Sequence, residues 1–353
     1  DGGTSATVSQ VVNVTAVNDP PVLGGIASAL NYTENAVLLV AAAGTLVDVD
    51  NANLSGGSLS VSIVTNGEVN DRLAIRNQGV LAGQVGVSGA NVTFGGVVVG
   101  TWTGGDTWTN PLVISFNASA TPAIGQAIVR NVTYANTSDA PVAPLSRVLS
   151  WQATDGVGGT SAAVLQTLTI VPVNDAPVVS GIVGPLTWVE KTVLAVAPAA
   201  TVFDIDSPDF DTGKLTVSVA VNASSWDRLE VRNDGVGDGQ VGVVAGVVTY
   251  GGVTVGGVTG GTSGTVPLVV TFNALATPGV VQAVLRNVQY RSATDNPSVL
   301  ARTLRYVLTD GDGGTSATVS QVVNVTAVND PPVLGGIASA LNYTENAVLL
   351  VAA

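Results

Sequence analysis

Carboxylates are the side chains of this sequence that could do chemistry, and they recur in short motifs. Asp-x-Asp pairs occur at Asp48 and Asp50 and again at Asp204 and Asp206. An Asn-Asp dipeptide followed by proline occurs at 18–20, 174–177 and 329–331. Carboxylate and amide oxygens are the ligands of hard cations such as Ca²⁺ and Mg²⁺. Carboxylates that converge repel one another unless a cation lies between them. The motifs therefore favour cation binding by oxygen.

The composition excludes most other chemistry. The 353 residues include no His and no Cys, so triads with His, thiolate metal sites and disulfides are excluded. A net charge of −13 argues against nucleic acid as a partner, because phosphate binding needs clustered Lys and Arg. Mean hydropathy is +0.45, but the longest apolar run, 36–47, is too short to cross a membrane, and we expect no membrane insertion.

We also expect no enzyme. Paired carboxylates could serve a glycosidase with aromatic platforms, but Trp102 and Trp108 have no counterparts in the second copy of the repeat described below. The triplet at 211–213, Asp-Thr-Gly, resembles an aspartic-protease motif. It occurs in one copy only, so no carboxylate dyad can form from it.

An internal repeat organises the chain. Residues 1–42 recur unchanged as 312–353, and a looser copy lies halfway between them. For example, VNDPPVLGG at 17–25 corresponds to VNDAPVVSG at 173–181. A period of this size is that of domains in series. We predict that 1–19 is the last strand of a preceding repeat, that 20–175 and 176–330 are two domains, and that 331–353 is the first strand of a following repeat. The alternative is an engineered or accidental duplication of the ends.

The local patterns predict an all-β chain. Apolar and polar residues alternate over 7–15, 59–63 and 215–219, whereas 112–116 and 268–272 are typical of buried strands. We therefore expect antiparallel β-sandwiches of the immunoglobulin type. Thr-Pro at 121–122 and at 277–278 predicts one short helix per domain, capped by the threonine. The Gly-rich stretches 79–105 and 235–264 are predicted to be inserted hairpins.

The acidic motifs resemble those of cadherin-like domains in very large prokaryotic surface adhesins. The resemblance covers the whole chain in outline and is specific at the linker sequences VNDPP and VNDAP, the Asp-x-Asp pairs, a first-strand glutamate, an Asp-Arg pair and a late aspartate. The resemblance implies calcium ligands at each junction between domains. At the central junction these are Glu34, Asp71, Asn174, Asp175, Asp204, Asp206 and Asp310. At the first junction they are Asp19, Asp48, Asp50 and Asp155, and at the last Glu190, Asp227 and Asp330.

Departures from the family pattern reduce the number of ions expected. The linker lacks the first Asp and the second Asn of the family, and Leu73 and Leu229 stand near the place of a further glutamate. The residues also permit other interpretations. The Asp-x-Asp pairs could be solvated turns, Asp71 could pair with Arg72, and Asp155 and Asp310 could serve hairpins.

These observations predict a structural function. We expect an extracellular spacer or stalk of a giant surface adhesin or filament, secreted or at the cell surface, rigidified by Ca²⁺ at its inter-domain junctions. Its partners would be further copies of the same repeat. One alternative is a glycan-binding or homophilic adhesion module that contacts surface glycans or other cells through the Gly-rich insertions and Trp102 and Trp108. Another is a fibre subunit that polymerises by exchange of end strands.

Overall fold

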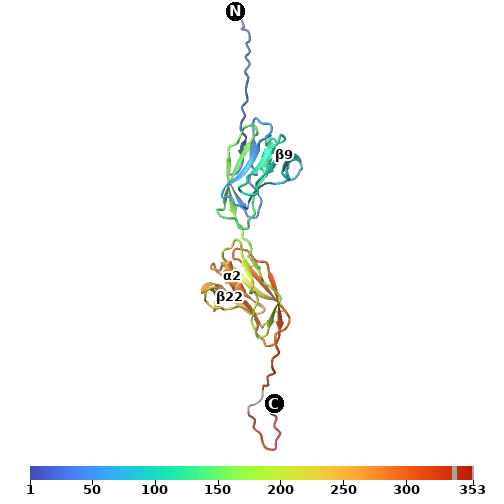
Figure 1. Ribbon diagram of the computed structural model, residues 1–353, viewed down its shortest axis with the longest axis vertical. Coiled ribbons are helices and arrows are strands. Elements are labelled where there is room, and N and C mark those ends of the chain that lie inside the picture. Colours follow the sequence, from blue (N-terminus) through green and yellow to red (C-terminus); the bar gives the residue numbers. More distant parts are fainter. Residues whose placement is uncertain (336–339, 352–353) are drawn as a thin grey trace. The chain divides into compact units, whose positions relative to one another are not determined.

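The computed structural model describes residues 1–335 and 340–351. The chain divides into two compact units, Asp1–Val173 (unit 1) and Asn174–Ala353 (unit 2), and each is described by itself (Figure 1). Each unit is a β-sandwich with one short helix, which confirms the predicted fold class. No helix within the described residues is both long and apolar enough to span a membrane.

Unit 1 contains a large sheet that faces two small ones. The large sheet has eight strands, in spatial order β2 (Ala29–Thr33), β13 (Val164–Val171), β12 (Ser146–Thr154), β5 (Ser58–Thr65), β10 (Leu112–Phe116), β9 (Val97–Thr103), β8 (Asn91–Phe94) and β7 (Val85–Ser88). The small sheets are β3 (Leu38–Leu39), β11 (Val132–Asn136) and β6 (Asp71–Ile75), and the pair β1 (Val22–Gly24) and β4 (Thr45–Val47).

Unit 2 repeats this topology. Its large sheet has the order β15 (Leu186–Val189), β26 (Val319–Thr326), β25 (Arg302–Thr309), β18 (Lys214–Val221), β23 (Val266–Phe272), β22 (Val253–Ser263), β21 (Val247–Tyr250) and β20 (Val241–Val244). Its small sheets are β16 (Leu194–Ala195), β24 (Val288–Ser292) and β19 (Asp227–Val231), and the pair β14 (Val178–Ser180) and β17 (Thr201–Phe203).

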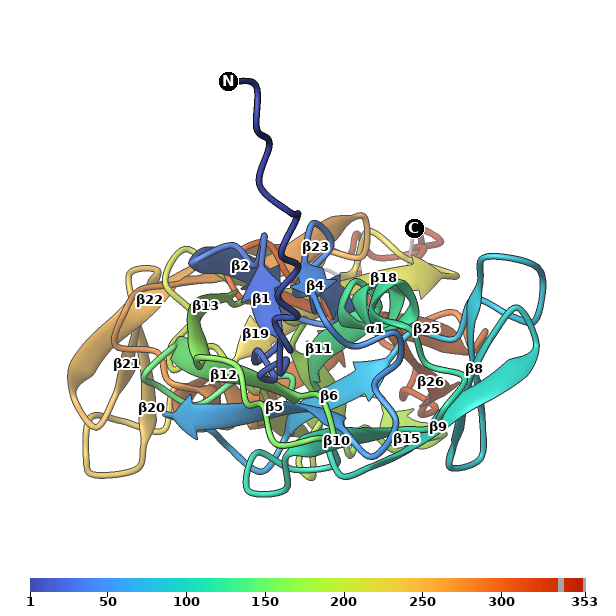
Figure 2. The ribbon, with the colours of Figure 1, turned by 90° about the horizontal axis from the view of Figure 1, so that it is seen from above.

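The Gly-rich stretches form hairpins, as predicted. In unit 1, β7, β8 and β9 extend the large sheet beyond β10, and in unit 2 β20, β21 and β22 extend it beyond β23. These strands lie at the outer edge of their sheets, where Figure 2 labels β8 and β9 of unit 1 and β20, β21 and β22 of unit 2. The insertions therefore widen each sandwich, and buried valines on them extend its core, for example Val92 in unit 1 and Val248 in unit 2.

One strand pair in each unit is parallel, whereas the other pairs between its strands are antiparallel as predicted. β1 pairs antiparallel with β4, but the next strand, β2, crosses to the large sheet and pairs parallel with β13, with Ala29 opposite Thr167. Gly25 lies at this crossing with φ +63°, and a Cβ atom there would be 2.3 Å from the backbone oxygen of Ala43. Gly181 has the same role before β15, which pairs parallel with β26. After the crossing, β2 and β15 each run in the same direction as the last strand of their unit.

Both predicted helices are present. In α1 (Pro122–Val129), Thr121 Oγ1 accepts a hydrogen bond from the Ile124 N–H at 3.3 Å, as an N-cap does. In α2 (Pro278–Arg286), Thr277 has the same extended backbone but makes no side-chain capping bond, so that part of the prediction is wrong. The helix faces that point inward include Ile128 in α1 and Val281 and Val284 in α2, all buried.

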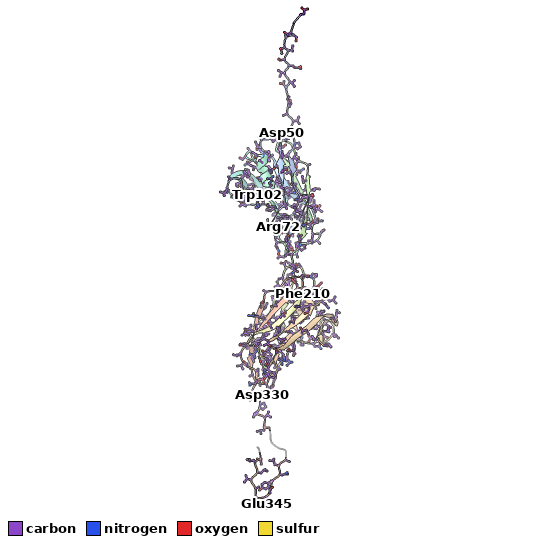
Figure 3. All side chains as sticks on the ribbon, turned by 180° about the vertical axis from the view of Figure 1, so that it is seen from behind. Asp50, Arg72, Trp102, Phe210, Asp330 and Glu345 are labelled. Atoms are coloured by element: carbon purple, nitrogen blue, oxygen red, sulfur yellow. The ribbon has the colours of Figure 1, made fainter. Side chains whose placement is uncertain are left out.

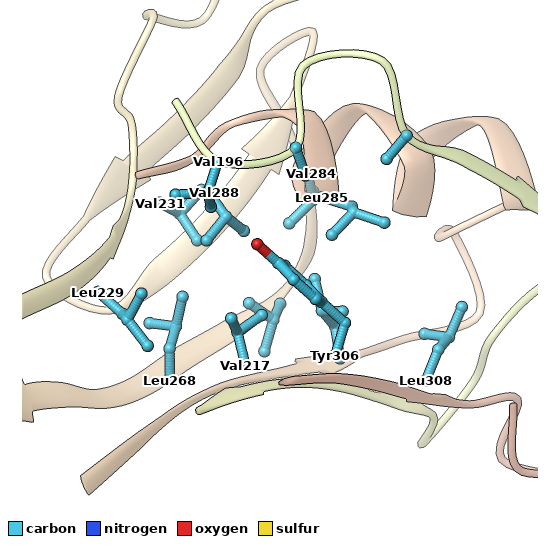
Figure 4. Close-up of a cluster of buried hydrophobic side chains, with 14 of the residues drawn as sticks. Val196, Val217, Leu229, Val231, Leu268, Val284, Leu285, Val288, Tyr306 and Leu308 are labelled. Atoms are coloured by element: carbon cyan, nitrogen blue, oxygen red, sulfur yellow. The ribbon is translucent and has the colours of Figure 1, made fainter. Parts of the chain in front are cut away.

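Each unit has its own hydrophobic core. The core of unit 1 places Tyr32 on β2 and Trp151 on β12, whereas unit 2 has Trp188 and Tyr306 at the corresponding positions, so the two aromatic types are exchanged. Figure 4 shows Tyr306 among the aliphatic side chains of its core. Its hydroxyl donates to Gln321 Oε1 at 2.7 Å, which satisfies a polar group inside the sandwich.

Identical sequences at the two ends of the chain have different structures. Residues 8–15 have the sequence of β26 but form no strand. Val12 and Val14 are 76% and 88% exposed, whereas their counterparts Val323 and Val325 are 0% and 7% exposed. β26 forms because β15 and β25 supply hydrogen bonds on both sides. The described residues of 331–353 also contain no strand. The assignment of both ends to adjoining repeats stays a prediction.

Candidate functional site

The candidate site of unit 2 lies where the linker enters the sandwich. β14 follows the linker residues Asn174 and Asp175 and pairs with β17, which ends immediately before Asp204. This pairing places the linker beside the Asp-x-Asp motif, and the Asp175 N–H donates to Asp206 Oδ2 at 3.1 Å. Five residues that the sequence predicted as ligands therefore meet at this end of unit 2, the fifth being Asp310.

Asp310 connects the linker to the loop after β25. Its side chain is completely buried, and Oδ1 accepts the backbone N–H groups of Asp312, Gly313 and Gly314 at 2.8, 3.0 and 3.0 Å. The other oxygen, Oδ2, accepts a hydrogen bond from Asn174 Nδ2 at 2.9 Å. Asp310 therefore positions the loop and the linker.

Two buried carboxylate oxygens lie at this end, one from each aspartate of the Asp-x-Asp pair. Asp204 Oδ2 and Asp206 Oδ1 are buried, and neither has a hydrogen-bond partner among the described residues. Burial raises the pKa of Asp204 above its ordinary value, and the neighbouring Asp206 raises it further. Leaving a buried carboxylate oxygen without a partner is costly. A hard cation would satisfy both oxygens, and the donor set of carboxylates and amides fits Ca²⁺.

The same end of unit 1 is built differently around one amide. Asn51 Nδ2 lies within hydrogen-bond distance of Asp48 Oδ1 at 3.2 Å, of Asp50 Oδ1 at 3.3 Å and of Asn18 Oδ1 at 3.0 Å. The residue at this position in unit 2 is Ser207, whose shorter side chain donates to neither aspartate. The Asn51 amide therefore supplies a side-chain donor that Ser207 does not supply to the Asp-x-Asp motif of unit 2.

The two remaining candidates at this end of unit 1 also have partners. The Asp19 N–H donates to Asp50 Oδ2 at 2.8 Å, and Asp155 Oδ2 accepts from Asn18 Nδ2 at 2.7 Å. Burial acts to raise the pKa of Asp155. The hydrogen bonds from Asn18 and from the backbone of 157–159 outweigh it and hold the pKa below the ordinary value. The surroundings of Asp155 therefore favour its ionised form, whereas those of Asp204 disfavour it.

The direction of the strands places the glutamate candidates at the end of each sandwich that is opposite the Asp-x-Asp motif. In unit 1, β13 runs from the Asp155 loop toward Glu34, a length of about 26 Å for eight residues. Figure 3 labels Asp50 and Arg72, which lie toward opposite ends of unit 1. Glu34 Oε2 accepts the Val173 N–H at 2.9 Å. Glu190 Oε2 of unit 2 accepts the Val328 N–H at 2.8 Å in the same way.

Sequence reasoning missed an acidic residue near each glutamate. Glu34 and Asp139 have carboxylate oxygens within 4.8 Å of each other. Asp295 is the counterpart of Asp139 in unit 2, and its charge contributes to raising the pKa of Lys191. The sequence contains a signal for these residues, because both copies of the repeat carry an aspartate two residues before a proline.

The Asp-Arg aspartates are structural. Asp71 is completely buried and accepts hydrogen bonds from Tyr134 Oη at 2.5 Å, Asn136 Nδ2 at 2.7 Å and Arg147 Nε at 2.9 Å. Its sequence neighbour Arg72 instead donates to the backbone oxygen of Val69.

Asp227 of unit 2 repeats this arrangement. It is completely buried and pairs with Arg302 and with the hydroxyl of Tyr290. Because buried arginines already neutralise Asp71 and Asp227, we leave both out of the ligand set. The arginines recur in both copies, at 147 and 302, but lie too far along the chain for local motifs to show the pairing.

Asp330 forms an ion pair with Lys191 at the far end of unit 2. The hydrogen bond from Lys191 to Asp330 raises the pKa of the lysine. The counterpart of Lys191 in unit 1 is Asn35. In unit 2 a lysine therefore supplies a positive charge at the end that carries Glu190.

Trp102 and Trp108 differ in their surroundings. Trp102 packs against the core of unit 1 and donates from Nε1 to the backbone oxygen of Gly89 at 3.0 Å. Trp108 lies in the following loop and is 38% exposed.

Comparisons with known proteins give weak similarity. No protein-family description matches the sequence, and no curated protein is similar to it by sequence. Among solved structures, the chain is similar to Drosophila N-cadherin EC1–3 at 12% identity, covering 88% of this chain and 69% of the other, with a TM-score of 0.21. It is similar to the collagen adhesin of S. aureus at 10% identity, covering 88% and 93%, with a TM-score of 0.21. It is similar to the C-terminal domain of the Streptococcus pyogenes antigen I/II-family protein AspA at 9% identity, covering 86% of this chain and 99% of the other, with a TM-score of 0.25.

Proposed function

We propose that the chain is an extracellular structural spacer, without catalytic activity, whose units bind Ca²⁺ where the linker enters the sandwich. One observation carries the proposal. In unit 2, Asp204 Oδ2 and Asp206 Oδ1 are buried without a hydrogen-bond partner among the described residues. The repetition of the whole unit supports the spacer function, because a part repeated in series provides length.

The ligands proposed in unit 2 are Asp204 and Asp206, and the linker residues Asn174 and Asp175 lie beside them. Asp310 acts on the site indirectly, because its carboxylate orients Asn174. A bound Ca²⁺ would neutralise the two aspartates and hold the linker against β17 and its following loop. The expected consequence is a stiffer connection at this end of unit 2.

Unit 1 is proposed to bind Ca²⁺ more weakly at its corresponding end. The Asn51 amide already donates to Asp48 and Asp50, and a cation would have to displace it. The two versions of the repeat would then differ in their need for calcium.

Calorimetric titration with CaCl₂ tests the proposal. We expect the chain to bind Ca²⁺ and to lose its tightest site when Asp204→Asn and Asp206→Asn are combined. Ser207→Asn places in unit 2 the amide that unit 1 has, and it should weaken the same site while keeping both carboxylates. Asn51→Ser is the reciprocal variant and should strengthen binding in unit 1. A chain that binds no Ca²⁺ at millimolar concentration, or binds it equally after Asp204 and Asp206 are replaced, would contradict the proposal.

Small-angle scattering tests the spacer function separately. If calcium stiffens the linker, the scattering profile of the wild-type chain should change when a chelator is added. The profile of the double variant at 204 and 206 should be insensitive to the chelator. Equal responses from both proteins would show that stiffness does not depend on this site.

A further inference from the structure

A groove in unit 1 is lined by the arginines Arg76 and Arg130. It has a volume of about 430 Å³ and lies beside α1, and it is lined by Gln126 of this helix and by Arg130 at its C-cap. Arg76 and Gln78, which follow β6, line the other side. Such a volume is in the range of small-molecule sites, about 300–1,000 Å³. The chain as a whole has a net charge of −13, so a positively charged groove is an exception on it.

Buried or backbone groups hold both guanidinium groups in place. Arg76 Nε donates to Asn131 Oδ1 at 2.9 Å, and Asn131 is 5% exposed and donates in turn to the backbone oxygen of Ala127 at 2.8 Å. Arg130 Nε donates to the backbone oxygen of Gly44 at 2.7 Å. Within 1–335 and 340–351, neither arginine forms an ion pair. Their terminal N–H groups are therefore positioned but not neutralised.

Unit 2 shows how one residue abolishes this arrangement. The position of Gln78 is occupied by Asp234, and Arg232, the counterpart of Arg76, turns to it with Nε at 2.5 Å from Oδ1 and Nη2 at 2.9 Å from Oδ2. Asn287, the counterpart of Asn131, is left with a buried Oδ1 that has no hydrogen-bond partner among the described residues. Arg286 keeps the backbone contact of its counterpart, donating to Ala200 at 2.7 Å. Only unit 1 therefore keeps both arginines available.

We propose that the groove of unit 1 binds an anionic sugar residue of an acidic polysaccharide. Guanidinium groups bind carboxylate and sulfate groups through paired N–H donors. The side-chain amide of Gln126 and the Nε2 group of Gln78 also line the groove, and they supply hydrogen-bonding groups for sugar hydroxyls. A bare carboxylate of a peptide would leave these amides unused. This binding site goes beyond the spacer function and lies apart from the calcium residues.

Titration calorimetry on the whole chain, with four short probes, tests the assignment. The probes are an oligogalacturonate, which carries carboxylates, a heparin oligosaccharide, which also carries sulfates, a neutral maltooligosaccharide and a polyglutamate peptide. We expect one equivalent of an acidic sugar to bind, more weakly at high salt, and the neutral sugar and the peptide not to bind. A preference between the first two probes identifies the anionic group. Each titration is repeated in calcium and in chelator, and the result should be the same in both, so that failure of the calcium site would leave this test unaffected.

Reciprocal variants make the test specific. Arg130→Gln and Gln78→Asp should each lower the affinity about tenfold, the second because it captures Arg76 as Asp234 captures Arg232. Asp234→Gln should add a second binding equivalent, in unit 2. Arg72→Gln removes an arginine outside the groove and should change the affinity by less than about twofold. The proposal is overturned if the wild-type chain binds no acidic sugar, if it binds the neutral sugar or the peptide equally well, or if Arg130→Gln and Gln78→Asp both leave binding unchanged.

Discussion

The aspartates at 71 and 227 show that one residue type lies in two different environments in this chain. Both lie completely buried against an arginine and a tyrosine, whereas the aspartates of the Asp-x-Asp motifs lie beside the linkers. An acidic motif alone does not distinguish a ligand from a structural anion. The distinction depends on whether a buried cation already neutralises the carboxylate.

Replacing Asp227 with Asn should destabilise unit 2 strongly. The change leaves the Arg302 guanidinium buried without its counter-charge, and breaking a buried pair in this way costs about 3–5 kcal/mol. Urea denaturation followed by tryptophan fluorescence measures the loss. Asp238→Asn, at an exposed position, is the control and should change the free energy of unfolding by less than about 0.5 kcal/mol. Similar small effects from both variants would contradict the structural role of Asp227.

The raised pKa of Asp204 predicts an unusual pH dependence in chelator. A carboxyl group whose pKa is higher in the folded state binds its proton more tightly when folded. It therefore stabilises the fold at low pH, and this contribution is lost as the pH rises through the folded-state pKa. In chelator, the melting temperature of the wild-type chain should fall over this range more than that of Asp204→Asn.

With saturating calcium, this difference in melting temperature between the wild type and Asp204→Asn should disappear or reverse, since the cation requires the ionised form of Asp204. Scanning calorimetry across the acidic range measures both series. Parallel curves for wild type and variant in chelator would show that Asp204 is not strained when ionised.

The linker and Asp-x-Asp residues of the candidate site could be predicted because they are local motifs. The residue that distinguishes the two units, Asn51 or Ser207, was not predicted, since its effect depends on three-dimensional contacts with Asn18 and the aspartates. The partner of Asp71 was missed for a related reason: Arg147 lies 76 residues further along the chain.

Among the elements, alternation of polar and apolar residues identified β5 and β18, and the Thr-Pro dipeptides identified both helices. The parallel pairing of β2 with β13 was not predictable in this way. It depends on the crossing at Gly25, where the backbone has a positive φ. It also depends on a partner strand, β13, that lies more than 100 residues further along the chain. Period-two patterns locate strands but carry no information on their neighbours.

The crossing glycines give a test at this scale. Gly181→Ala in unit 2 should cost about 2–3 kcal/mol, because φ is +69° and the new Cβ would meet the Ala199 oxygen at 2.3 Å. Gly239→Ala is the matched control, with φ +72° and nothing within 4 Å, and should cost about 1–2 kcal/mol from backbone strain alone. Thermal unfolding of the two variants measures the difference. Equal losses would mean that the crossing tolerates a side chain.

At the scale of the whole molecule, the two units have separate cores and should unfold separately. Calcium at one hundred times its dissociation constant stabilises the unit that binds it by about 2.7 kcal/mol. We expect calorimetry to show two transitions and calcium to raise the one that belongs to unit 2 by the larger amount. The combined changes Asp204→Asn and Asp206→Asn assign that transition, because they should abolish its shift. A uniform shift of both transitions would indicate that calcium does not distinguish the units.

The parallel pair of β2 and β13 has a mechanical consequence. The chain enters β2 at the strand end that lies beside the start of β13 and leaves unit 1 from the opposite end of β13. A force that stretches the chain therefore pulls the two strands past each other along their length. Their hydrogen bonds are loaded in shear and must break together, not one after another as in a hairpin pulled open from its free end. The arrangement recurs in β15 and β26, so each unit resists tension at the place where tension is applied.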